Sequence, residues 1–189
     1  FTPTAVAETP SEYVDLGFGL FPHYGINTYT NAKTGREGND PVSVNFPSTL
    51  FNPTNFDANQ WAYAAKEAGM KYMIYTVKQH FGWSGWDTAY STYDVATSSV
   101  PTLDTVREVM EACELYGLKL ILYYSALDRT NYPDPKQPGK DWTNKNANYT
   151  QFVKNQMTEL LTNYGTITGV WFDAATAITN AQAIEIKNH

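Results

Sequence analysis

Three segments of the chain repeat one pattern: apolar residues at helical spacing, then a glycine, then a short apolar run. Apolar positions that recur every three or four residues indicate amphipathic helices, and short apolar runs between turn residues indicate strands. The pattern predicts helices at residues 57–69, 102–117 and 148–165. The strands expected to follow them lie at 70–78, 118–125 and 166–173, with an earlier strand at 17–25.

The residues at the helix ends support this assignment. Asp57 is placed to cap the first helix, with Gln60 at the reciprocal position of a capping box. Gly69, Gly117 and Gly165 each follow the last apolar position of a helix, where a left-handed residue usually ends it. A further helix is expected from about residue 178.

Strands that are apolar on both faces and alternate with helices indicate a parallel sheet covered by helices, in the α/β class. A doubly wound nucleotide-binding sheet would carry a glycine-rich turn after its first strand, and no such turn is present. A (β/α) barrel places polar side chains at the C-terminal ends of its strands. Such residues occur there: His23 and Tyr24, Lys78 and His80, Tyr124 and Ser125, and Asp173. We therefore favour the barrel.

The number of strands predicts only half of a barrel. A closed (β/α) barrel has eight strands and about 250 residues, whereas the pattern gives four βα units in a chain of 189 residues. We expect a single domain over 1–189, a half TIM barrel, in which residues 1–16 form an N-terminal extension. Unpaired strand edges favour association, so either a second copy in a homo-oligomer or further chain is expected to complete it.

Composition narrows the class of ligand. Charged residues make up 17% of the chain and aromatic residues 15%, including 14 Tyr and 5 Trp, which suits either a surface for neutral sugars or an aromatic core. A net charge of −6 argues against nucleic acid and anionic membranes as partners. No apolar run approaches the ~20 residues that span a bilayer.

Cys113 lies on a helical apolar stripe and is interpreted as a buried hydrophobe. The first residue, Phe1, is consistent with a processed, secreted protein or with a trimmed chain.

Five blocks of sequence follow one another along the chain: FGLFPHYGINTYT, LFNPTNFDANQWAYAAKEAGMKY, KQHFGW, LILYYSALDR and LLTNYGTITGVWFDAAT. In this order and spacing they resemble the retaining α-L-fucosidases of glycoside hydrolase family 29. The resemblance runs from about Phe18 to Thr176. It implies a glycosidase that removes terminal α-L-fucose from oligosaccharides or glycoconjugates, without a cofactor. The alternative is a fucose-binding or scaffold half-barrel derived from such an enzyme.

The resemblance also implies roles for individual residues. Asp173 corresponds to the nucleophile that forms a covalent fucosyl intermediate, and Tyr124 is expected close to it. His23 and His80 would hydrogen-bond sugar hydroxyls. The remaining candidates for substrate contact are Tyr24, Lys78, Gln79, Trp83 and Trp86.

Two positions depart from the family pattern. Gln79 stands where the family has the first histidine of a Lys-His-His triplet, and an amide can hydrogen-bond a hydroxyl but cannot carry a charge. Gly38 follows Glu37 where the family has tryptophan.

Retaining hydrolysis needs a second carboxyl group, about 5–5.5 Å from the nucleophile. In the family it comes from a loop after the fourth strand. The sequence does not single out this acid; Glu37 is one candidate, and Asp87 and Asp128 also lie in expected loops. Glu185, the one acidic side chain after Asp173, falls in an expected helix. The three histidines show no metal-ligand spacing, so no metal is expected.

Overall fold

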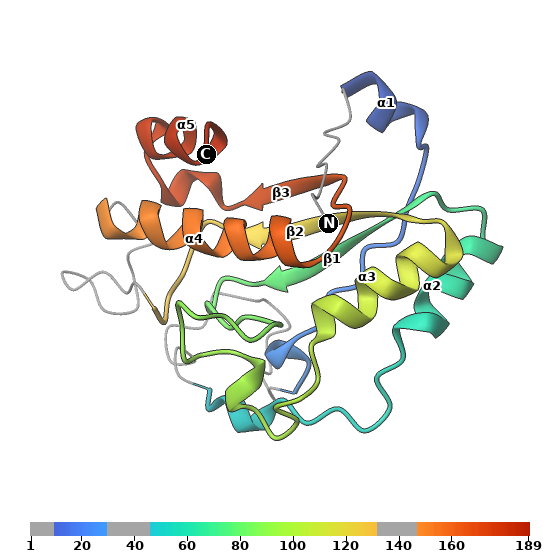
Figure 1. The fold of residues 1–189 in the computed structure, drawn as a ribbon, viewed down its shortest axis with the longest axis horizontal. Helices are drawn as coiled ribbons and strands as arrows, with labels where there is room; N and C mark the ends of the chain where they lie inside the picture. Colours follow the sequence, from blue (N-terminus) through green and yellow to red (C-terminus); the bar gives the residue numbers. More distant parts are fainter. Residues whose placement is uncertain (1–9, 30–45, 132–146) are drawn as a thin grey trace.

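A three-stranded parallel sheet forms the centre of the computed structural model, which describes residues 10–29, 46–131 and 147–189. The strands are β1 (Tyr72–Lys78), β2 (Lys119–Ser125) and β3 (Gly169–Asp173), in the order β1-β2-β3. All three arrows point to the same side of the molecule, at the left of Figure 1. The C-terminal ends of the strands therefore share one edge of the fold, as the barrel hypothesis requires.

Helices connect and cover these strands. Helices α2, α3 and α4 precede β1, β2 and β3 in turn, and α4 runs across the sheet in Figure 1. The helices are α1 (Pro10–Asp15), α2 (Ala58–Glu67), α3 (Thr105–Tyr116), α4 (Ala147–Asn163) and α5 (Asn180–Lys187). Short 3-10 turns lie at Ile26–Tyr29, Ser48–Leu50, Val95–Thr97 and Ala175–Ala177. The helices and strands expected after residue 57 are confirmed.

The expected capping residues hold two of these helices. The Asp57 carboxylate accepts a hydrogen bond from the Gln60 amide at 3.0 Å and so caps α2. At the end of α3, Gly117 has φ 67°, a left-handed conformation that costs glycine little. Local sequence signals thus fix where these helices begin and end.

The strand expected at 17–25 is reduced to one bridge, between Leu20 and Met73. Leu20 makes two ladder bonds to β1, but the next amide that would pair belongs to Pro22, which has no N–H group. After Pro22, the backbone of Tyr24 bonds a side chain of β1 in place of its backbone: the Thr76 hydroxyl accepts from the Tyr24 amide and donates to the Tyr24 carbonyl. In the part of the chain that the structure describes, three strands form the sheet and this bridge joins the first segment to β1, so a half barrel of four units is not confirmed.

Alternate residues of the strands face two different environments. Met73, Tyr75 and Val77 of β1, with Leu120 and Leu122 of β2, pack against α2, α3 and α4 in the main core. Cys113 of α3 is buried in the same core, where burial raises the pKa of its thiol to about 12. This confirms its interpretation as a buried hydrophobe.

The opposite face of the sheet carries a smaller cluster, formed by Ile74, Ile121 and Tyr123 with Phe21 packed against them. Following the alternation of side chains along β3, Trp171 and Asp173 lie on this face as well. We call it the open face. Among the described residues, no helix is long and apolar enough to cross a membrane.

We expect Asp104→Ala to destabilise the fold more than Asp57→Ala. Both carboxylates cap a helix, so each substitution should cost about 0.5–2 kcal/mol. Asp104 also accepts a hydrogen bond from the Tyr164 hydroxyl at 2.6 Å, which ties α3 to the end of α4. Urea denaturation of the two variants measures the difference, and equal losses would contradict this role of Asp104.

Candidate active site

The pairing of β2 with β3 places Asp173 beside Ser125 at the ends of the two strands. The pairing continues one step further, because the Ala126 amide donates to the Asp173 carbonyl at 2.8 Å. The backbone on both sides of the carboxylate is therefore held by the sheet. A group fixed in this way keeps its position while a substrate binds and reacts.

The Asp173 carboxylate is held by groups from three elements. Its Oδ2 atom accepts a hydrogen bond from the Tyr123 hydroxyl at 2.5 Å, and Oδ1 accepts from the Ala174 amide at 2.7 Å. His80, just after β1, points its Nε2 atom at Oδ2 from 3.8 Å. The carboxylate side chain remains 43% exposed, so a ligand can still reach it.

These contacts keep Asp173 ionised. Burial raises the pKa of its carboxyl, but the hydrogen bonds from Tyr123 and Ala174 lower it, and the nearby histidines His80 and His23 lower it further. The net effect is a pKa below the ordinary value of 3.8. At neutral pH the group is a carboxylate, which is the form that can attack an electrophilic carbon.

The backbone immediately after the carboxylate is strained. Ala174 has φ 52°, which a residue with a Cβ atom rarely adopts. This conformation lets the Ala174 amide point back at Asp173 Oδ1. Strain of about 1–3 kcal/mol of this kind persists where surrounding structure enforces it, and it is concentrated at functional sites.

His23 and Gln79 meet at the edge of the same region. The Gln79 side-chain nitrogen lies 3.3 Å from His23 Nδ1, and since an amide nitrogen only donates, Nδ1 accepts and the ring proton is on Nε2. The Gln79 Oε1 atom is buried and has no hydrogen-bond partner among the described residues. His23 itself is exposed and packs against Phe21 on the open face.

Lys78 and Tyr124 lie on the other side of the sheet from Asp173, which corrects the expectation that Tyr124 lies close to this carboxylate. A register irregularity between Thr76 and Lys78 pairs Lys78 with Tyr124, so both side chains face the helices. The Tyr124 hydroxyl donates to Gln156 of α4 at 2.7 Å, and the residue is fully buried. The tyrosine that contacts Asp173 is its neighbour, Tyr123.

Lys78 forms a buried ion pair. Its ammonium lies 3.1 Å from Asp128 Oδ2, both side chains have no exposed surface, and it also donates to the Ser125 carbonyl at 3.1 Å. The ammonium sits 4.4 Å from the centre of the Tyr124 ring, within cation–π range. Burial lowers the pKa of Lys78, and the Asp128 carboxylate opposes this shift. Lys78 thus joins the ends of β1 and β2 to the loop after β2.

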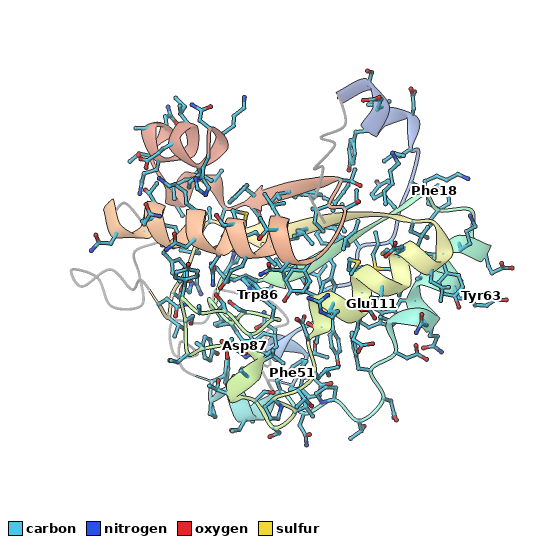
Figure 2. The ribbon with its side chains drawn as sticks, viewed as in Figure 1. Phe18, Phe51, Tyr63, Trp86, Asp87 and Glu111 are labelled. Atoms are coloured by element: carbon cyan, nitrogen blue, oxygen red, sulfur yellow. The ribbon has the colours of Figure 1, made fainter. Side chains whose placement is uncertain are left out.

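Three aromatic candidates are also engaged in packing. The Trp83 indole donates to Ser48 at 2.8 Å, and the Trp86 indole donates to Glu159 of α4 at 3.0 Å. Trp86 belongs to the loop after β1 and lies next to α4 (Figure 2). Both indoles are buried. The hydroxyls of Tyr24 and Tyr29 are 2.7 Å apart, and Tyr24 packs within an aromatic cluster next to Phe51. The structure does not bring these rings to the Asp173 carboxylate.

The loop acids are placed differently from one another. Asp128 is committed to Lys78, and it also accepts from the backbone and side chain of Asn131. Asp87 is exposed and lines an open groove of about 620 Å³ formed by the loop after β1. Glu185 of α5 pairs with Lys154 at 2.9 Å. Glu37, the other candidate acid, lies outside the described residues.

Two residues of the site were not selected from the sequence, Tyr123 and Trp171. The signal that could have found them is alternation, because each lies two residues before a strand end, on the same face as that end. Trp171 is 46% exposed, and its ring centre is 5.4 Å from that of Phe21. Among the described residues, no group of three or more His, Cys, Asp or Glu could hold a metal ion.

Comparison with known proteins decides which family this arrangement represents. The family model described as alpha-L-fucosidase matches residues 2–189, nearly the whole chain. The chain belongs to the α-L-fucosidase family, glycoside hydrolase family 29.

Curated and solved members of the fucosidase family show the extent of the match. Alpha-L-fucosidase 1 of Arabidopsis thaliana is 35% identical over 158 residues, which covers 82% of this chain and 28% of the plant protein. A glycoside hydrolase 29 family member from an unknown rumen bacterium superposes with a TM-score of 0.71 at 37% identity, covering 92% of this chain and 29% of that one. Unliganded alpha-L-fucosidase AlfC from Lactobacillus casei gives a TM-score of 0.76 at 26% identity, with coverages of 94% and 64%. The chain thus spans less than a third of the length of the first two of these relatives.

We expect Tyr123→Phe to raise the pKa of Asp173 in this fucosidase-family chain. The substitution removes a hydrogen bond that favours the carboxylate. Because the folded pKa is depressed, the stability that this bond contributes is present above the unfolded pKa and is lost as pH falls through the folded pKa. The difference in stability between wild type and variant should therefore shrink as the solution is acidified below pH 4.

Carbon-13 titration of the Asp173 carboxyl measures this shift directly. Tyr124→Phe is the matched control, because its hydroxyl bonds Gln156 on the other face and its loss should leave the Asp173 pKa unchanged. An unchanged pKa in Tyr123→Phe would contradict the assignment.

We expect Lys78→Met to be strongly destabilising. It leaves the Asp128 carboxylate buried without its cation, which typically costs about 3–5 kcal/mol. The double variant Lys78→Met/Asp128→Asn should recover part of the loss. The control is Lys154→Met, which breaks the more exposed pair with Glu185 and should cost no more than about 1 kcal/mol. Thermal denaturation compares the three, and similar losses in both single variants would refute a buried, uncompensated charge.

Proposed function

We propose that this chain supplies the nucleophile of a retaining α-L-fucosidase that removes terminal α-L-fucose from glycans. The observation that carries the proposal is the Asp173 carboxylate: it is held by Tyr123 and Ala174, faces His80, and is accessible to a ligand. Membership of the fucosidase family supports the same function. Asp128, by contrast, is a carboxylate with no exposed surface, held in an ion pair with Lys78.

The chemistry follows from this geometry. An Asp173 oxygen attacks C1 of the fucosyl residue while the bond from C1 to the leaving oxygen breaks, and that oxygen takes the bonding electron pair and a proton from the general acid. The product is a fucosyl ester of Asp173. Water, deprotonated by the same acid in its basic form, then attacks C1 from the opposite face and restores the carboxylate. Two inversions give overall retention.

His23, Gln79 and His80 are the residues that we propose contact the sugar hydroxyls. His80 Nε2 lies 3.8 Å from Asp173 Oδ2, His23 is close enough to lower the pKa of the Asp173 carboxyl, and the Gln79 side-chain nitrogen lies 3.3 Å from His23 Nδ1. With Nδ1 accepting from the Gln79 side-chain nitrogen, the donor that His23 offers to a sugar hydroxyl is Nε2. Hydrogen-bond donors and acceptors of this kind suit an uncharged deoxyhexose. The aromatic open face, with Trp171 and Phe21, suits the apolar side of such a ring.

The second carboxyl group stays a prediction, with Glu37 as the candidate in this chain. Its place in the reaction is between C1 and the leaving oxygen, about 5–5.5 Å from Asp173. Export from the cell, completion of the barrel by a second copy and the four-unit half barrel also stay predictions from the sequence.

We expect Asp173→Ala to abolish hydrolysis of an aryl α-L-fucoside, a substrate whose leaving group needs little help from an acid. Azide, a small anion that can occupy the space of the lost carboxylate, should restore cleavage and give a fucosyl azide of inverted configuration. Proton NMR of the wild-type reaction should show the first product with retained configuration. Asp15→Asn, which changes an exposed acid at the end of α1, is the control and should keep full activity.

Two outcomes would oppose this function. Undiminished hydrolysis by Asp173→Ala would exclude Asp173 as the nucleophile. Saturable fucose binding by the wild type without any hydrolysis would favour a carbohydrate-binding protein instead.

A further inference from the structure

The buried Ser125 hydroxyl occupies a position that the reaction itself does not explain. Ser125 ends β2 directly beside Asp173, yet it has no exposed surface, so no substrate atom reaches it. Its hydroxyl oxygen lies 2.7 Å from Nδ1 of His80. The other ring nitrogen, Nε2, faces Asp173 Oδ2. The serine therefore contacts the side of His80 that is turned away from the carboxylate.

The hydrogen-bond partners of Ser125 determine where its proton goes. A serine hydroxyl has one proton to donate and two lone pairs to accept with. The Leu127 carbonyl, which can only accept, lies 2.8 Å away and receives that proton. The Leu127 amide donates to the same oxygen at 3.0 Å. With its proton donated to the Leu127 carbonyl, the oxygen keeps its second lone pair for His80, and this pattern assigns the donor role to Nδ1.

This assignment fixes the tautomer of His80. With the proton on Nδ1, the neutral ring presents a lone pair at Nε2, and protonation of the ring adds a proton at Nε2 facing the Asp173 carboxylate. Among the described residues, Nε2 faces the Asp173 carboxylate, and Tyr123 on β2 and His23 before β1 are the further titratable groups that act on that carboxylate. The opposite tautomer would turn Nε2 into a donor even when the ring is neutral.

We propose that Ser125 is a positioning residue that locks His80 in the Nδ1–H form, so that Nε2 accepts from a substrate hydroxyl held next to Asp173. The substrate part of this inference rests on the proposed fucosidase function, whereas the tautomer does not. Ser125 is itself held in place by two hydrogen bonds: its hydroxyl donates to the Leu127 carbonyl, and its carbonyl accepts from the Lys78 ammonium.

Nitrogen-15 NMR of the imidazole rings tests the lock on the chain itself. The His80 signals are identified by their loss in His80→Gln, and at a pH where the ring is neutral Nδ1 should show the protonated shift and Nε2 the unprotonated one. In Ser125→Ala this preference should be lost, and Ser125→Thr, which keeps a hydroxyl, should restore it. A protonated Nε2 in the neutral wild-type ring would overturn the proposal, whether or not the protein is active.

A matched control separates the lock from ordinary stabilisation. Ser48 is also buried, and its hydroxyl likewise donates to a backbone carbonyl, that of Asp94, and accepts from a ring N–H, that of Trp83. Ser48→Ala should therefore cost similar stability and leave the His80 signals unchanged. If Ser48→Ala shifts the His80 tautomer as Ser125→Ala does, the effect is general loosening and the proposal fails.

Kinetics with the aryl α-L-fucoside provide the second readout. Ser125→Ala should lower kcat/KM by about tenfold, equivalent to about 1.4 kcal/mol, and Ser125→Thr should recover it, while Ser48→Ala stays near wild type. If Ser125→Ala changes the His80 tautomer but the wild type is inactive, the role of Ser125 is supported and the fucosidase function is refuted. An active wild type whose kcat/KM and tautomer are both unaffected by Ser125→Ala would refute the lock alone.

Discussion

The parallel pairing of β2 with β3, in the register that sets Ser125 opposite Asp173, is the constraint on which the site depends. Side chains alternate along a strand, so this register places Tyr123 on the same face as Asp173 and lets its hydroxyl reach the carboxylate. A shift of one residue would bring Tyr124 to the open face and turn Tyr123 into the helical core. The chemistry of the carboxylate is therefore a consequence of backbone pairing, reinforced by the bond from Ala126 to the Asp173 carbonyl.

Two carboxylates near the strand ends show how surroundings distinguish a buried, paired acid from an accessible one. Asp128 is fully buried against the Lys78 ammonium and the amide groups of Asn131, so its charge is neutralised inside the protein. Asp173 is ionised by weaker partners, a phenol, a backbone amide and a nearby imidazole, and it stays open to a ligand. Both arrangements satisfy the rule that a charge away from water needs partners. Only the second leaves oxygen atoms available for reaction.

The irregularity in β1 links these two environments. Between Thr76 and Lys78 the register shifts, which sends the Lys78 side chain to the helical side of the sheet and leaves the following residues, Gln79 and His80, at the site. The ammonium then holds both Asp128 and the Ser125 carbonyl. Lys78 thus supports Ser125, the residue beside Asp173, without contacting Asp173 itself.

The sequence by itself determined the helices, the three strands that follow them, the glycines at the helix ends and the capping residue Asp57, because these depend on local periodicity and on backbone conformation. It also pointed to Asp173, since an acid at the end of an apolar strand is unusual. Tertiary structure alone decided that Pro22 interrupts the first strand, that Tyr123 rather than Tyr124 meets the carboxylate, and that Lys78, Trp83 and Trp86 belong to the interior. These outcomes depend on how the strands pair and on a one-residue irregularity in β1. Alternation sorts the residues of one strand into two faces, but it does not say which face the helices cover or where the alternation is interrupted.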